Sequence, residues 1–194
     1  MLKERFLEIY NEYVTRPGSA ELLSWLESSD FFRAPASTRF HGNYEGGLLE
    51  HSLNVYDSLK DRIANDPEMW NSDGSCKVTE ETIAVCALLH DTCKINYYKK
   101  CQRNVKEDGV WVTKDAYEVD EKFPCGDHAD KSIIILQNFM HLEPEEILAI
   151  RGHMGGFDSA VKGGSFFISK VFEQSRLAVH LHLADMEATY LKEN

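Results

Sequence analysis

The stretch that decides how this chain folds and what it binds reads Leu88-Leu89-His90-Asp91-Thr92-Cys93-Lys94. Ala84, Leu88 and Asp91 recur at steps of four and three, so they share one face of a helix that ends near Asp91. A carboxylate seldom follows an apolar face unless it is paired or binds a metal. Imidazole and carboxylate groups are the usual ligands of divalent transition metals. The pattern therefore indicates a metal site at His90 and Asp91.

Other predicted helices place a histidine or an aspartate in a similar apolar or terminal context. These residues are His51, His128, His153 and Asp185. His51, for example, has apolar Leu48 and Val55 on its own helical face. Taken singly, such a histidine is more often a hydrogen-bonded core residue, and such an aspartate more often lies on the surface. Taken together, these side chains can converge on the His90-Asp91 pair.

The hydrophobic periodicity predicts a mainly helical chain. Helical patterns cover residues 2–14, 20–27, 46–64, 79–91, 128–140, 144–153, 165–174 and 176–192. Between the fourth and fifth of these, residues 104–113 alternate around an Asp-Gly pair, which is typical of a hairpin turn. We therefore expect a small β-hairpin near residues 101–122, inserted into a helical domain. Trp111, Tyr117 and Phe123 are expected to pack this hairpin onto the helices, with stacking on a base as the alternative.

Composition limits the classes of protein to which the chain can belong. Its 194 residues, with 21 basic and 32 acidic side chains and a net charge of −11, suit one domain with a substantial core. No apolar run approaches the roughly 18 residues of a membrane span, and the charged start lacks the apolar stretch of an export signal. We therefore expect a cytoplasmic protein whose five cysteines, without CxxC spacing, are free thiols. Its acidity argues against stable polynucleotide binding, which needs a basic face.

Three motifs, in this order, resemble the HD-domain metal-dependent phosphohydrolase superfamily. They are Gly47-Leu48-Leu49-Glu50-His51-Ser52, the stretch at 88–94, and Leu181-His182-Leu183-Ala184-Asp185. The resemblance covers about residues 40–192. It implies a single domain, 1–194, with an N-terminal helical extension at 1–40 and an HD-type metal-binding part at 41–194. Cys93 takes the place at which the motif usually has glycine, which implies a different turn before Lys94.

The resemblance also implies a set of metal ligands. Members with one metal use four ligands, which correspond here to His51, His90, Asp91 and Asp185. Members with two metals add two histidines before the last aspartate, and His128 and His153 match that order. We expect two divalent transition metal ions (Mn, Fe, Co, Ni or Zn) per chain, bridged by Asp91. The first would be completed by His51, His90 and Asp185, and the second by His128 and His153.

The expected activity follows from this centre. Divalent metals activate water and bind phosphoryl oxygens, so we expect hydrolysis of a phosphate ester or phosphodiester, of a nucleotide, by metal-activated water. Lys94, three residues after Asp91, is the best-placed cation for phosphate oxygens, and these two are the expected catalytic residues. Further substrate contacts are expected at His41, Lys131 and Arg151, each with a structural or surface role as the alternative. The hairpin lies between Lys94 and His128 in the sequence and is expected to form a lid or substrate wall.

Two other functions stay open on the sequence. Some proteins of HD fold are mixed-valent di-iron oxygenases with the same six ligands, and iron content with oxygen-dependent turnover distinguishes them from hydrolases. A non-catalytic nucleotide-sensing domain is the third interpretation, although such a domain usually loses a ligand. The expected partner is a small phosphorylated substrate, a nucleotide, and not a membrane. The sequence leaves the native metal and the oligomeric state open.

Overall fold

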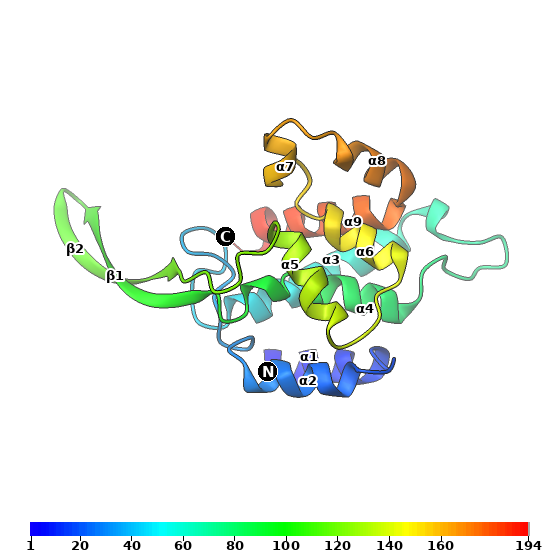
Figure 1. Ribbon diagram of the computed structural model, residues 1–194, viewed down its shortest axis with the longest axis horizontal. Helices are drawn as coiled ribbons and strands as arrows, with labels where there is room; N and C mark the ends of the chain where they lie inside the picture. The colour runs from blue at the N-terminus through cyan, green and yellow to red at the C-terminus, as the bar shows by residue number, and fades with distance from the viewer. Residues whose placement is uncertain (194) are drawn as a thin grey trace.

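A computed structural model describes residues 1–193 and shows a helical protein with one projecting β-hairpin (Figure 1). The α-helices are α1 (Leu2–Tyr13), α2 (Ser19–Ser28), α3 (Gly47–Ala64), α4 (Glu80–Leu89), α5 (His128–Gln137), α6 (Pro144–Gly152), α7 (Ser159–Lys162), α8 (Phe167–Gln174) and α9 (Arg176–Glu187). Short 3₁₀ turns lie at Pro67–Met69, Thr92–Lys94 and Gly155–Phe157, and a π-helical turn at Ala188–Lys192 follows α9. The predicted mainly helical fold is confirmed. None of the described helices is long and apolar enough to cross a membrane.

Helix α4 lies at the centre of the fold. Thr79 caps it by accepting a hydrogen bond from the backbone N–H of Thr82 at 3.0 Å, and two glutamates in the first turn favour the helix dipole. Every residue from Thr82 to Leu89 is buried. A helix that is apolar all round has to be covered on all sides, and α4 packs against α1, α3 and α6. Its last turn therefore delivers His90 and Asp91 to the interior.

The other helices that frame the site pack around α4 and around each other. Helix α9 packs against both α3 and α6, and α5 packs against α6 and against the turn that follows α4. Fully buried leucines fill the space between these helices, among them Leu48, Leu53, Leu88 and Leu181. Segments from both ends of the chain thus meet at the C-terminal end of α4.

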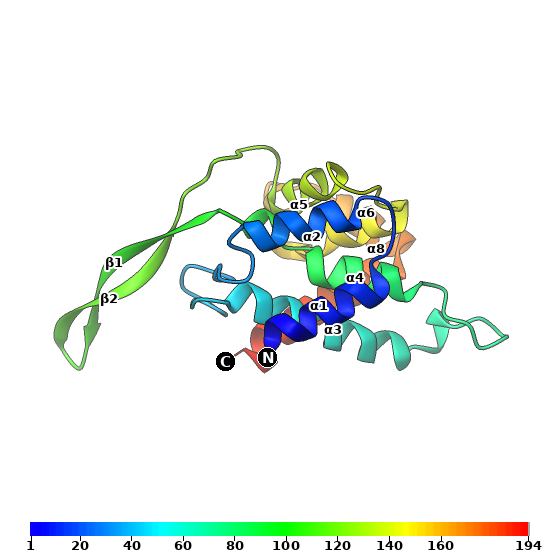
Figure 2. The same cartoon turned by 90° about the horizontal axis from the view of Figure 1, so that it is seen from below.

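Helices α1 and α2 lie side by side across one face of this assembly (Figure 2). Phe6, Tyr10, Leu22 and Leu26 from these helices are at most 1 % exposed and belong to the same buried core as the rest of the chain. Residues 1–40 therefore share their packing with the metal-binding part. The division of the chain at residue 40 stays a prediction.

A buried ion pair joins the α1–α2 connection to α6. Arg16 donates to both carboxylate oxygens of Glu146 at 2.7 Å, and the Glu146 side chain is fully buried. The same carboxylate accepts the backbone N–H of Glu143 at 2.9 Å, so it also caps α6. The N-terminal segment thus neutralises a charge inside the core.

The inserted hairpin extends away from the helices (Figures 1 and 2). Strands β1 (Tyr98–Glu107) and β2 (Val110–Val119) have ten residues each and pair antiparallel along their whole length. Asp108 and Gly109 form the turn with φ values of 49° and 86°, because a two-residue turn of type I′ needs both residues in the left-handed region. The predicted hairpin is confirmed, with strands that begin at residue 98 and end at residue 119.

The expectation that the hairpin's aromatic residues pack onto the helices is wrong for two of the three. Trp111 is 69 % exposed and Phe123 is 44 % exposed, whereas Tyr117 is half-buried. In the described part of the chain these strands pair only with each other, so a ribbon that leaves the body carries its side chains into solvent. The base of the hairpin, at Tyr98, is the part that reaches the site described below. Most of the hairpin is therefore not a lid over this site.

We expect Arg16→Ala to lower the free energy of unfolding by about 3–5 kcal/mol, because it leaves the buried Glu146 carboxylate without its cation. Arg5→Ala is the matched control, since its ion pair with Asp57 has side chains that are 45 % and 37 % exposed. Such surface pairs are worth less than about 1 kcal/mol. Urea unfolding followed by circular dichroism measures both variants, and equal losses would contradict the expectation.

Candidate metal centre

The carboxylate of Asp91 is the centre of the site, and its side chain is 4 % exposed. Its Oδ2 atom lies 3.5 Å from Nε2 of His90 and 3.6 Å from Nε2 of His51. Its Oδ1 atom lies 2.5 Å from Nε2 of His128 and 3.6 Å from Nε2 of His153. Each oxygen of one carboxylate therefore faces its own pair of histidines.

The first half-site consists of His51, His90, Asp91 and Asp185. His51 comes from the second turn of α3, His90 directly follows α4, and Asp185 comes from the last turn of α9. Nε2 of His51 lies 3.3 Å from Oδ1 of Asp185 and 3.3 Å from Nε2 of His90. One ligand atom from each of these three lies within 4.8 Å of the others. The structure thus brings together the four ligands that the sequence assigns to the first metal.

The second half-site consists of Asp91, His128 and His153. His128 is the first residue of α5, which begins at a capping box formed by Asp127 and Asp130. His153 directly follows α6, and its ring centroid lies 5.7 Å from that of His128. The side chain of His153 is 1 % exposed. Both additional histidines that the sequence suggests thus reach the opposite side of the same carboxylate.

Backbone carbonyls fix which nitrogen of two histidines faces Asp91. Nδ1 of His90 donates to the carbonyl of Ala87 at 2.9 Å, and Nδ1 of His153 donates to the carbonyl of Ile150 at 2.6 Å. Burial lowers the pKa of His90 to about 3, so this ring is neutral at pH 7. A neutral ring that donates from Nδ1 presents the Nε2 lone pair to the site.

These lone pairs fit a bound metal ion. Nε2 of His153 is buried without a hydrogen-bond partner among the described residues, although buried polar atoms nearly always have one. Nε2 of His90 lies 3.3 Å from Nε2 of His51 and 3.5 Å from Oδ2 of Asp91. A divalent cation in this cluster would give the lone pair of His153 a partner, because imidazole and carboxylate are its preferred ligands.

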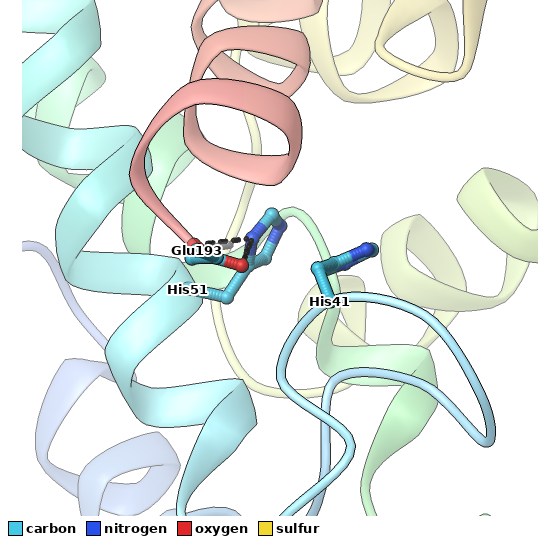
Figure 3. Close-up of side chains that lie close together, drawn as sticks. All are labelled: His41, His51 and Glu193. Carbon is cyan, nitrogen blue, oxygen red and sulfur yellow. Dashed lines mark hydrogen bonds and ion pairs between the residues drawn. The ribbon is translucent and has the colours of Figure 1, made fainter. Parts of the chain in front are cut away.

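Glu193 supports His51 from behind (Figure 3). Its two carboxylate oxygens lie 3.1 and 3.2 Å from Nδ1 of His51, and one of them accepts the side-chain N–H of Asn54 at 3.0 Å. A carboxylate in this position fixes the tautomer of a ligating histidine and raises its basicity. The sequence reasoning missed Glu193, which lies 142 positions from His51 and belongs to no motif. The π-helical turn at Ala188–Lys192 returns the chain to α3 at this point.

His41 approaches the site from the loop before α3 (Figure 3). Its ring centroid lies 4.9 Å from that of His51. Both of its ring nitrogens are buried and have no hydrogen-bond partner in the part of the chain that the structure describes. Burial lowers the pKa of His41 to about 4, so the ring is neutral at pH 7 and offers one N–H and one lone pair.

At His51, Asp91 and Lys94, contacts with oppositely charged groups oppose the effect of burial on the pKa. Burial disfavours the charged form of His51, yet hydrogen bonds to Asp185 and Glu193 raise its pKa to about 9. Lys94 is buried, and its Nζ atom lies 2.6 Å from Oδ2 of Asp91. Although burial opposes both charges, the Asp91 carboxylate raises the pKa of Lys94, and the Lys94 ammonium lowers that of Asp91 well below its usual range. The pair is therefore ionised at pH 7.

A cavity of about 770 Å³ opens onto the centre. Its inner wall includes His41, Asp91, Lys94, His128, His153 and Asp185, and its outer wall includes Phe40, Tyr98, Met154 and Phe157. Phe40 is 79 % exposed and Phe157 is 47 % exposed. The volume lies within the range of about 300–1,000 Å³ that is usual for small-molecule sites. His51 and His90 are also buried and are not part of the cavity wall.

Two predicted substrate contacts are not part of the cavity wall. Arg151 donates to Asp158 at 2.5 Å and lies 2.7 Å from Asp130. Lys131 forms an ion pair with Glu121. Each of these cations is thus held by carboxylates of its own neighbourhood. A role in substrate binding stays a prediction for both residues, and it requires these ion pairs to open.

Histidines and aspartates from α3, α4, α5, α6 and α9, gathered around one buried carboxylate, define a helical metal-binding domain of the His-Asp type. The HD domain family matches residues 48–189, and the chain belongs to this family. The dihydroneopterin 2′,3′-cyclic phosphate phosphodiesterase of Methanocaldococcus jannaschii is 31 % identical over 121 residues, which are 61 % of this chain and 43 % of that protein. The chain therefore covers less than half of the length of this relative. No solved structure was found to match the chain.

We expect Glu193→Ala to weaken metal binding at the first half-site by about 10- to 100-fold, the usual loss when the partner behind a ligating histidine is removed. Glu193→Gln should lose less, because its amide oxygen still accepts from Nδ1 of His51. Glu187→Gln is the control, since this residue bonds Ser58 and Arg62 outside the metal centre. Calorimetric titration with Zn²⁺ measures the affinities. An unchanged affinity in Glu193→Ala would show that Glu193 does not support the ligand.

Proposed function

We propose that this chain is a metal-dependent phosphohydrolase that cleaves a phosphodiester in a small, nucleotide-like molecule. The observation that carries this proposal is the Asp91 carboxylate, which faces two sets of histidines and pairs with buried Lys94 beside an open cavity. Membership of the HD domain family supports a hydrolytic reaction. The phosphodiesterase from M. jannaschii supports a phosphodiester as the bond that is cleaved.

The proposed centre holds two divalent transition metal ions, of which Mn, Fe, Co, Ni and Zn all suit the ligands. His51, His90, Asp91 and Asp185 would hold one ion, and Asp91, His128 and His153 the other, as their contacts with Asp91 and with each other suggest. When bound, such ions supply a water molecule of lowered pKa and positive charge for phosphoryl oxygens. The protein contributes a rigid set of ligands, because each comes from or adjoins a packed helix.

The remaining side chains of the inner wall position the substrate. Lys94 keeps its charge and its orientation through Asp91, and its ammonium has further N–H donors for a phosphoryl oxygen. His41 offers an unpartnered N–H in the same cavity, suited to a hydrogen bond with the ester oxygen that leaves. Both groups thus bring donors to the same cavity.

The outer wall favours a substrate with a flat ring. Phe40 and Phe157 are exposed at the cavity, and aromatic side chains of this kind stack on nucleobases. The phosphate would lie at the inner wall, near Lys94. The chain's net charge of −11 provides no general attraction for a polynucleotide. The proposal is therefore a mononucleotide-sized diester, hydrolysed in the cytoplasm.

Metal analysis of protein purified without a chelating tag should find two metal ions per chain. His90→Ala/Asp91→Ala should lose them, together with hydrolysis of bis(p-nitrophenyl) phosphate, because it removes ligands of both half-sites. A chelator should abolish the activity of the native protein, and added Mn²⁺ or Zn²⁺ should restore it. Iron with oxygen-dependent turnover would instead favour the di-iron oxygenase. Nucleotide binding without turnover in the metal-loaded protein would favour a sensing domain.

Lys94→Met should lower kcat by about 100-fold or more, the usual cost of removing one donor to a developing phosphoryl charge. Metal content should stay unchanged, since the lysine is not a ligand. Lys99→Met is the control, because this lysine pairs with Glu118 on the exposed hairpin. Steady-state kinetics with the same diester separate the two variants, and a native kcat in Lys94→Met would remove the lysine from the mechanism.

A further inference from the structure

The thiol of Cys93 lies within the second half-site. Its Sγ atom is 3.3 Å from Nδ1 and 3.5 Å from Nε2 of His128. Asp91, Cys93 and His128 each offer one ligand atom, and these three atoms lie within 4.8 Å of one another. The Cys93 residue is only 7 % exposed. Neither the sequence motif nor the six-ligand set assigns this side chain a role.

The backbone holds Cys93 in this position. Its N–H donates at 3.1 Å to Oγ of Ser132, a fully buried residue one turn beyond His128 in α5. Among the described residues other than glycine, positive φ values occur only at Asn96 and Asp108. Cys93 is therefore outside the left-handed region, and the turn does not need the glycine that usually stands here. The side chain is thus presented to the site without backbone strain.

A second buried histidine nitrogen faces the same carboxylate oxygen as His128. Nε2 of His153 is buried, has no hydrogen-bond partner in the described chain, and lies 3.6 Å from Oδ1 of Asp91. We propose that Cys93, as a thiolate, is a fourth protein ligand of the metal in the second half-site, beside Asp91, His128 and His153. This inference rests on the two-metal centre of the proposed function.

The sulfur already lies beside the ring of His128, closer to Nδ1 at 3.3 Å than to Nε2 at 3.5 Å. A turn of this ring that directs Nε2 and the sulfur to one point would let both side chains hold the same ion. On binding, the sulfur–metal bond replaces the S–H bond, and the proton passes to solvent without any change of oxidation state.

A thiolate ligand makes the two half-sites chemically different. The first has only nitrogen and oxygen ligands, which accept Mn²⁺ as well as Zn²⁺. The second has a soft sulfur ligand, which favours Zn²⁺, Fe²⁺ and Co²⁺ over Mn²⁺. The centre should therefore load two different metals when both kinds are supplied together.

Cobalt provides the test, because a thiolate bound to Co²⁺ gives a near-ultraviolet charge-transfer band. The native protein with two Co²⁺ bound should show this band, and Cys93→Ala should lack it. Cys76→Ala is the matched control, since this half-buried cysteine lies in the loop beside Trp70. In Cys93→Ala the affinity for the second Co²⁺ should fall at least about 100-fold, more than the usual loss of a group behind a ligand.

A second measurement does not depend on any variant. Alkylation of Cys93 by iodoacetamide, followed by peptide mass spectrometry, should be slowed by Zn²⁺ while that of Cys125 is not. Two bound Co²⁺ ions without the band, or a band that survives in Cys93→Ala, would overturn the thiolate ligand and leave the proposed hydrolase intact. Failure to bind any metal would overturn both.

Discussion

The structure depends on one buried negative charge, the carboxylate of Asp91. A carboxylate that is 4 % exposed is tolerated only when cations and donors contact it, and here Lys94 and His128 do so. Lys94 and the four histidines around Asp91 come from or adjoin four helices, α3, α4, α5 and α6, so these helices have to converge on the end of α4. The same convergence places the carboxylates of Asp185 and Glu193 beside His51. The packing of the helices and the assembly of the candidate metal centre therefore depend on the same groups.

Much of the fold and most of the candidate metal ligands could be predicted from the sequence, because the sequence signals for them are local. The apolar face that runs into His90-Asp91, the cap at Thr79 and the Asp-Gly turn each act within a few residues. The role of Glu193 could not be predicted, because its contact with His51 depends on the path of the chain after α9. The direction of the hairpin could not be predicted either, since the sequence around Trp111 does not show whether this side chain packs on the helices or faces solvent.

The cations near the ligands show a further limit of reasoning from spacing. Arg151 and Lys131 lie close in sequence to ligating histidines, as a phosphate-binding residue should. In the structure each has a carboxylate within ten positions of the chain that reaches it first. Lys94 differs because its acidic partner is Asp91, the aspartate at the centre of the site, and both residues line the cavity.

The spread of the ligands along the chain bears on how the protein matures. His51, His90 and Asp91 leave the ribosome early, whereas Glu193, which supports His51, follows it by 142 positions. Until α9 has docked against α3 and α6, neither Asp185 nor Glu193 is present to complete the first half-site. A nascent chain therefore offers no finished pocket for metal capture. A metal centre built from these residues would therefore be complete only in the folded chain.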